Sequence, residues 1–134
     1  MIQPVITLIA WSMVMLVWLY VQRLPSIYRY AVSEDHLSTG EAVRHLSPRV
    51  QWPADNYNNL LEQPTLFYAL CLVVNLTGRT SFEIEYFAWL YVALRILHSL
   101  VQAISNVAVI RFGLFIASSG VLAIMCFSAF NLVF

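Results

Sequence analysis

Polar side chains recur along one apolar stretch of the chain at spacings that place them on a single helical face. Arg95, His98 and Gln102 follow Tyr91 at intervals that match one face of a helix with 3.6 residues per turn. A charged side chain at the centre of a membrane-spanning helix costs about 3 kcal/mol, so it persists where it is paired or faces water. We therefore predict that this stripe points into a helix bundle and holds the residues able to do chemistry.

A second polar face precedes this stripe in the chain. Its members recur at intervals of three and four residues: Asp55, Asn58, Asn59 and Glu62. A carboxylate within a helix bundle needs a cation or several donors, because burial otherwise neutralises it. We expect Glu62 and the bases of the later stripe to turn toward each other. The partner of Glu62 stays open between Arg95 and the pair His98 and Gln102, which lie closer to its depth.

Three interpretations of the two faces are compatible with the residues. The polar side chains can lock helix to helix, line a hydrated pocket that takes an anionic or polar ligand, or line a conduction pathway. No metal site is predicted, because Glu41 and His45 offer two ligands without a third. Nucleic acid is not an expected partner, since seven arginines balance seven acids and no basic cluster exists.

The elements that position these residues must lie in a membrane. Of 134 residues, 60% are apolar and only 10% are charged, and the mean hydropathy is +0.73. A soluble domain carries about a quarter charged residues, so this composition excludes a soluble enzyme, a secreted disulfide scaffold and a disordered tail. The lipid bilayer is the expected surrounding of the chain.

Four charge-poor windows have the length of membrane spans, which need about 20 helical residues. They cover residues 2–21, 56–76, 84–109 and 112–134, with a hydrophilic loop at 22–55. We predict an all-α, integral membrane bundle of four transmembrane helices that forms one domain over residues 1–134. Pro64 predicts a bend in the second span. Gly113, Ala117 and Gly120 predict a packing seam on the fourth.

The arginines predict the orientation in the membrane. Five lie in the 22–55 loop or at the turn before the fourth window, namely Arg23, Arg29, Arg44, Arg49 and Arg111. Only Arg79 falls in a loop on the other side. Because positively charged loops stay in the cytoplasm, we expect the 22–55 loop to be cytoplasmic and both termini to be outside.

Several of these residues together resemble the MAPEG family, the membrane-associated proteins in eicosanoid and glutathione metabolism. The resemblance rests on the run from Asn59 to Pro64 that opens the second span, on Arg95-Ile-Leu-His98 in the third, and on Arg111 after it. The sequence is similar to a bacterial branch of the family. The resemblance implies a four-helix protomer that assembles as a homotrimer, with glutathione as co-substrate between neighbouring subunits. Together with the arginine distribution, we expect a bacterial inner membrane protein with periplasmic termini.

The resemblance also implies roles for individual residues. Arg111 would act catalytically by stabilising the glutathione thiolate, and Asn59 and Glu62 would hold the peptide. The other members of the implied binding site are Arg95, His98 and Gln102. The implied activity is that of a glutathione-dependent transferase or peroxidase, with a lipophilic small molecule as the electrophile.

Two positions depart from the pattern of the glutathione-using members. Asp55 stands where they commonly carry an arginine, and Gln102 where they commonly carry a tyrosine. An anion in place of a cation reverses the sign of the interaction with a negatively charged tripeptide. The alternative prediction is therefore a non-catalytic membrane protein whose buried polar network serves helix packing and trimer assembly.

Overall fold

The computed structural model describes the backbone of residues 1–33 and 46–133, and this part of the chain is helical without strands. The helices are α1 (Ile2–Ser33), α3 (Pro48–Glu62), α4 (Pro64–Leu76), α5 (Phe82–Ile104) and α6 (Ala108–Val133). The predicted all-α fold is confirmed. Three stretches are long and apolar enough to cross a membrane, namely Ile2–Arg29, Phe82–Ile104 and Ala108–Leu132. The second predicted span is divided between α3 and α4, and the count of four spans stays a prediction.

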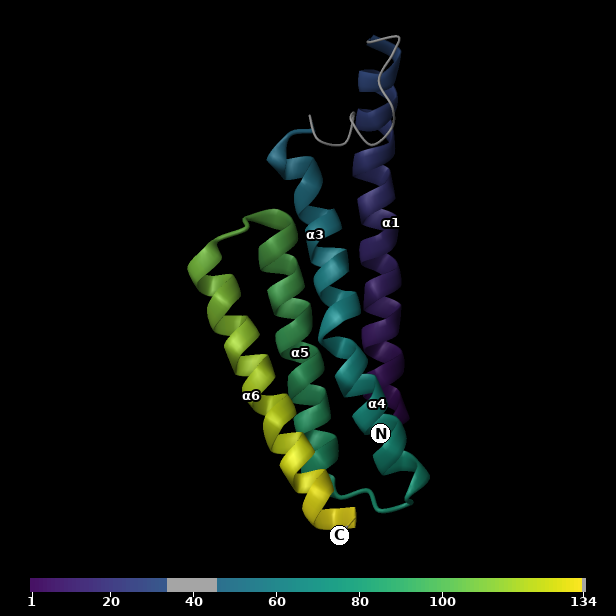
Figure 1. Ribbon diagram of the computed structural model, residues 1–134, viewed down its shortest axis with the longest axis vertical. Helices are drawn as coiled ribbons and strands as arrows, with labels where there is room; N and C mark the ends of the chain where they lie inside the picture. The colour runs from purple at the N-terminus through teal and green to yellow at the C-terminus, as the bar shows by residue number, and fades with distance from the viewer. Residues whose placement is uncertain (34–45, 134) are drawn as a thin grey trace.

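The helices lie side by side as an elongated bundle (Figure 1). α3 and α4 follow each other as one column that packs between α1 and α5, and α6 packs along α5. The two termini lie at the same end of the bundle. The turn between α5 and α6 and the start of α3 lie toward the opposite end, which we call the arginine end because Arg49 and Arg111 are there.

The segment predicted as a loop, residues 22–55, is helical at both of its ends. α1 continues to Ser33 with Pro25 inside it, and α3 begins at Pro48. The prediction was wrong in this respect because hydropathy marks where the apolar run stops, whereas the backbone hydrogen bonds of a helix can continue into polar surroundings. Glu41 and His45 lie outside the described residues.

The helix at the third predicted span, α5, is shorter than the predicted window of residues 84–109. α5 ends at Ile104, and Asn106 adopts a left-handed backbone conformation with φ of 49°. Asparagine tolerates this conformation better than most residues do. The chain therefore turns before Asn106 can extend the polar stripe, and α6 begins early enough to place Arg111 in its first turn.

Pro64 interrupts the second predicted span, as expected. α3 ends at Glu62 and α4 begins at Pro64, with Gln63 between them. A proline in the first turn of a helix is tolerated because its missing N–H would have no partner there. Gln63, at the junction of the two helices, donates from its side-chain Nε2 to Ser119 Oγ of α6 at 2.7 Å.

The bundle core changes character along its length. Near the termini it is apolar, and its buried side chains include Leu8, Phe67, Cys71, Ile84 and Ala88. Toward the arginine end the buried side chains become polar and include Asn56, Arg95, His98, Ser99 and Gln102. The apolar half supplies the packing that holds the polar half in register.

The small residues of α6 do not form the predicted seam within the protomer. Gly113, Ala117 and Gly120 are exposed, and a Cβ added at either glycine would meet nothing within 4 Å. α6 instead buries a face that contains Ser118, Val121, Met125 and Ala129. The prediction was wrong for the single chain because spacing alone does not tell which side of a helix meets its neighbour.

Candidate functional site

The polar stripe of α5 points into the bundle, which confirms the first prediction. The exposed fractions of its side chains are 0% for Tyr91, 1% for Arg95, 3% for His98 and 2% for Gln102. The faces that carry Leu97 and Ile104 are exposed instead. A helix within lipid can keep such groups only if they look inward, and this rotation of α5 satisfies that condition.

Two side-chain hydrogen bonds join α3 to α5. Asn56 Nδ2 donates to Ser99 Oγ at 2.7 Å, and Asn59 Nδ2 donates to Gln102 Oε1 at 2.9 Å. The Asn56 side chain is fully buried, and its Oδ1 has no hydrogen-bond partner among the described residues. These contacts fix the rotation of α3 against α5 and therefore the direction in which Asn59 presents its amide.

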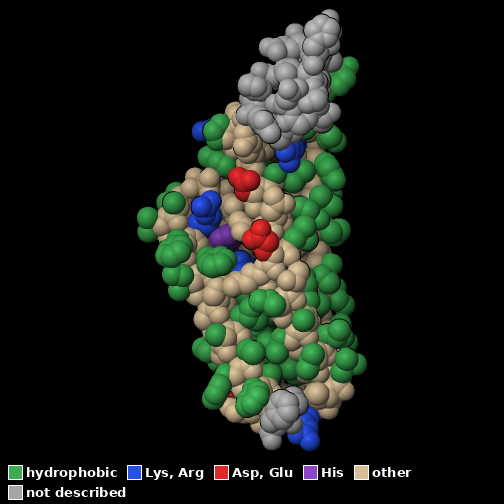
Figure 2. Space-filling view, viewed as in Figure 1, with side chains coloured by type: hydrophobic (Ala, Val, Ile, Leu, Met, Phe, Trp, Pro, Cys, Tyr) green, Lys and Arg blue, Asp and Glu red, His purple; other side chains and the backbone are tan. Residues whose placement is uncertain are grey.

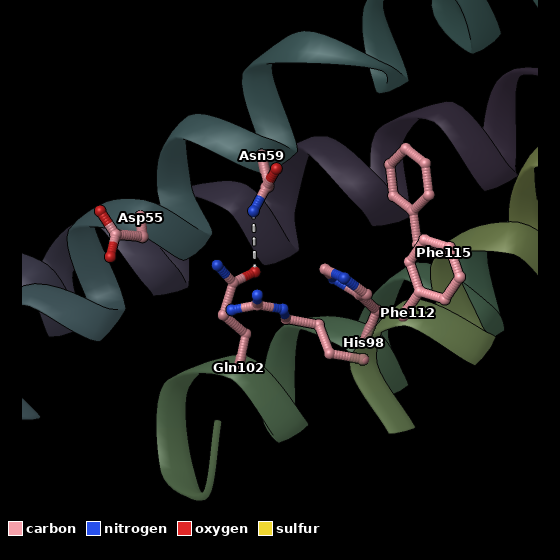
Figure 3. Close-up of a pocket in the computed structure, with 7 residues that line it drawn as sticks. Asp55, Asn59, His98, Gln102, Phe112 and Phe115 are labelled. Carbon is pink, nitrogen blue, oxygen red and sulfur yellow. Dashed lines mark hydrogen bonds between the residues drawn. The ribbon is translucent and has the colours of Figure 1, made fainter. Parts of the chain in front are cut away.

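A cavity of about 430 Å³ opens beside these hydrogen bonds, between α3, α5 and α6. Its lining residues are Asp55, Asn59, His98, Gln102, Arg111, Phe112 and Phe115. In Figure 3, Asn59 and Gln102 point toward each other across the cavity, and Asp55 lies nearer the start of α3. In the space-filling view, acidic, basic and histidine side chains gather around a hollow in an otherwise largely apolar face (Figure 2). We call this hollow the polar cavity.

Arg111 is held at the rim of the polar cavity by the turn that precedes it. Arg111 Nη1 donates to Asn106 Oδ1 at 2.6 Å, and Asn106 is the residue with the left-handed backbone. The side chain is half-buried. Because one guanidinium carries five N–H donors, this hydrogen bond leaves most of them available to a ligand.

Arg95 lies beneath the polar cavity and does not line it. Its guanidinium carbon is 5.4 Å from the centre of the Tyr91 ring and 5.3 Å from that of Phe115, and Nε donates to the Tyr91 hydroxyl at 3.1 Å. Both rings provide a cation–π contact. The buried Nη2 has no hydrogen-bond partner among the described residues. Arg95 thus contributes a positive charge beside the ring of Phe115, which lines the polar cavity.

Glu62 does not take part in this arrangement, which contradicts the expected pairing. Its side chain is exposed, and the salt bridge of the described residues joins the N-terminal amine to Glu85 at 3.7 Å instead. The prediction that both side chains face the interior of the bundle is therefore confirmed for Arg95 and wrong for Glu62. The physical reason is that Asn56 occupies the position facing α5, which rotates Glu62 away from it.

Several residues of the site were not singled out from the sequence as binding groups. Asp55 was noted as a departure from the family pattern, and it lines the polar cavity. Phe112 and Phe115 form the apolar wall. Their spacing of three residues at the start of α6 places both on one helical face, and this signal could have identified them. Asn56 has no such signal, because its neighbours Asn58 and Asn59 are of the same type.

Within residues 1–33 and 46–133, no group of three or more histidine, cysteine, aspartate or glutamate side chains lies in an arrangement that could hold a metal ion. The polar groups that line the polar cavity are guanidinium, amide and imidazole groups and one carboxylate. Such a set suits a small organic ligand with carboxylate and ammonium groups.

Comparison with protein families supports a relationship over nearly the whole chain. A sequence model of the MAPEG family matches residues 1–131. The match covers every residue that lines the polar cavity. The chain matches no curated protein and no solved structure.

Proposed function

This chain belongs to the MAPEG family, and we propose that its polar cavity binds glutathione for transfer to lipophilic electrophiles or for reduction of lipophilic peroxides. The observation that carries the proposal is the convergence of Asn59, Gln102 and Arg111 from three helices on one cavity. Its volume of about 430 Å³ falls in the range of small-molecule sites. The three helices that are long and apolar enough to cross a membrane support a site within reach of the bilayer.

The charges of the polar cavity suit a zwitterionic peptide. Glutathione carries one ammonium, two carboxylates and a thiol. Asp55 can accept hydrogen bonds from the ammonium, while Arg111 donates to an anionic group and Arg95 adds a positive charge below. The aspartate that departs from the family pattern thus gives the cavity a place for the cationic end of the ligand.

Arg111 is the residue that we assign to activation of the thiol. Glutathione supplies the nucleophilic sulfur, but a free thiol has a pKa of about 8.5 and is mostly protonated at neutral pH. A guanidinium within hydrogen-bond reach stabilises the thiolate and lowers that pKa. The hydrogen bond from Arg111 to Asn106 holds the guanidinium in place before the ligand binds.

The apolar wall formed by Phe112 and Phe115 is the surface that a lipophilic substrate would contact first. Phe112 is 65% exposed and also lines the polar cavity beside Phe115. A molecule dissolved in the acyl chains can therefore contact Phe112 and the cavity contents at the same time. His98, whose ring lies 6.3 Å from that of Phe115, closes the inner side.

The proposal is tested by calorimetric titration of the detergent-solubilised protein with glutathione, followed by a conjugation assay with a chlorinated aromatic. We expect saturable binding, ultraviolet absorbance of the bound thiolate, and turnover that depends on glutathione. Absence of both turnover and thiolate absorbance would falsify the transferase function. Turnover with a lipid hydroperoxide but not with the chlorinated aromatic would assign the peroxidase reaction.

A second candidate function is architectural. The hydrogen bonds of Asn56 with Ser99 and of Asn59 with Gln102 satisfy several polar groups without any ligand. Interhelical hydrogen bonds of this kind stabilise helix association in membranes. In this function the polar network serves helix packing and assembly of a homotrimer, and added glutathione leaves the thermal stability of the protein unchanged.

We extend the proposal to the assembly and the location of the protein. A homotrimer would bring a neighbouring subunit against the polar cavity and complete the glutathione site. The arginine end would lie on the cytoplasmic side of a bacterial inner membrane, with both termini in the periplasm. The distribution of arginines supports this orientation, because Arg49 and Arg111 lie at the end of the bundle opposite to the termini.

A further inference from the structure

A second cavity lies at the arginine end, apart from the polar cavity. Its volume is about 350 Å³. It is lined by Trp18 and Gln22 of α1, Arg49 and Trp52 of α3, and Ala103 and Ile104 of α5. Consecutive residues of a helix point about 100° apart, so Gln102 faces the polar cavity while Ala103 faces this one. The two cavities therefore lie on different sides of the last turns of α5.

The polar groups of the second cavity are unpaired within the part of the chain that the structure describes. The Arg49 guanidinium and the Gln22 amide form no hydrogen bond or salt bridge with a described residue. Arg23, the next residue of α1, lies outside the lining, and its buried Nε has no partner among the described residues. The lining contains no carboxylate. This end of α1 and α3 thus presents positive charge and hydrogen-bond donors to an incoming anion.

The depth of the cavity matches the boundary between acyl chains and headgroups. From Ile2 to Trp18 and Gln22, α1 rises about 24 and 30 Å at 1.5 Å per residue. The hydrocarbon layer is about 30 Å thick. Tryptophan favours the interfacial layer, where its ring is apolar and its N–H can find a polar partner. Two indoles and one arginine around a common cavity at this depth are the groups expected for an amphiphile with an anionic head.

We propose that the second cavity binds the phosphate-bearing headgroup of an anionic phospholipid. Arg49 donates to the phosphate with the two-pronged geometry of a guanidinium, and Gln22 donates from its amide. The rings of Trp18 and Trp52 flank the glycerol region. Ile104, which is exposed, contacts the start of an acyl chain. This site is independent of glutathione binding, because it shares no lining residue with the polar cavity.

The experiment uses the full-length protein in a neutral detergent. It is titrated separately with short-chain phosphatidylglycerol, short-chain phosphatidylcholine and inorganic phosphate. Tryptophan fluorescence reports occupancy because Trp18 and Trp52 line the cavity. Native mass spectrometry counts the lipids retained. We expect phosphatidylglycerol to bind about fivefold more tightly than phosphatidylcholine, as one interfacial arginine predicts. Inorganic phosphate alone should leave the fluorescence unchanged.

Matched variants connect this preference to one side chain. Arg49→Gln should remove the preference for phosphatidylglycerol, and Arg49→Lys, which keeps the charge, should retain part of it. Arg79→Gln removes an arginine at the other end of the bundle and should bind like the parent protein. An unchanged preference in Arg49→Gln overturns the proposal, as does equal binding of the two lipids. Equal occupancy by inorganic phosphate overturns a lipid as the ligand.

Discussion

Arg111 shows how a single side chain can be prepared for chemistry by its neighbour. The guanidinium is fixed by Asn106 Oδ1 at 2.6 Å and lines the polar cavity beside Phe112. A group held in place before the substrate arrives has less conformational entropy to lose when the thiolate forms. The contribution of Arg111 is therefore expected mainly in the chemical step.

We predict that Arg111→Gln lowers kcat/KM for glutathione conjugation by about 100-fold, since removal of one preorganised donor to a developing anion has that scale. Steady-state kinetics with a chlorinated aromatic measures the effect. Arg79→Gln is the matched control, because Arg79 Nη1 donates to the Leu132 carbonyl oxygen at the opposite end of the bundle. Equal loss in both variants would show that Arg111 has no specific part in the reaction.

The buried pair of Asn56 and Ser99 supports a second prediction at this scale. Asn56→Ala leaves the Ser99 hydroxyl without its donor, and Ser99→Ala leaves the Asn56 amide without its acceptor. A double-mutant cycle should give a coupling free energy of about 0.6 kcal/mol, the average for interhelical hydrogen bonds in membrane proteins. Unfolding in mixed detergent micelles measures it. Additive single effects would mean that the 2.7 Å contact adds nothing to stability.

At the scale of the element, the turn between α5 and α6 decides where the polar stripe ends. Asn106 meets two demands, because its backbone adopts a φ of 49° and its side chain accepts from Arg111. Alanine satisfies neither demand, whereas glycine satisfies the first alone. The two substitutions therefore separate the backbone contribution from the side-chain contribution.

We predict that Asn106→Ala lowers the free energy of unfolding by about 1 kcal/mol, because alanine tolerates the left-handed conformation less well than asparagine and cannot accept the hydrogen bond from Arg111. Asn106→Gly should keep the stability closer to that of the parent protein. Both variants should lose activity, because each releases Arg111. Thermal unfolding and conjugation kinetics on the same preparations test this. Full activity in Asn106→Gly would show that Arg111 needs no support from the turn.

At the scale of the whole molecule, the exposed position of Glu62 supports the proposed homotrimer. Its carboxylate is exposed, and Leu61 and Leu66 beside it are 49% and 64% exposed. Glu62 lies 14 residues from each end of the α3–α4 column, Pro48 and Leu76, or about 21 Å by helical rise. A carboxylate that lies within a bilayer persists where it meets a partner or water. A neighbouring subunit would provide that partner.

We predict that Glu62→Gln shifts the protein from the homotrimer toward smaller species, because it removes the charge available to the neighbouring subunit. Light scattering combined with size-exclusion chromatography measures the mass of the protein after subtraction of the detergent. Glu83→Gln is a suitable control, since Glu83 is an exposed residue at the start of α5, near the end with the termini. A parent protein of monomeric mass would contradict the trimer, and an intact Glu62→Gln trimer would exclude Glu62 from its interface.

The properties that depend on one helix at a time could be predicted from the amino-acid sequence. Its apolar composition predicted helices suited to a membrane, and the spacing of Arg95, His98 and Gln102 predicted the inward face of α5. Pro64 predicted the bend in the second span, where α3 ends and α4 begins. Each of these follows from local periodicity or from a single backbone restriction, and the structure confirms them.

The packing of the helices against one another selected which polar groups meet. Asn56 rather than Glu62 faces α5, Asp55 lines the polar cavity, and the left-handed Asn106 places Arg111 at its rim. These outcomes depend on the relative rotation and depth of two helices and on a turn between them. Periodicity within one helix leaves all three free, because several residues of similar polarity compete for the same side and packing selects among them.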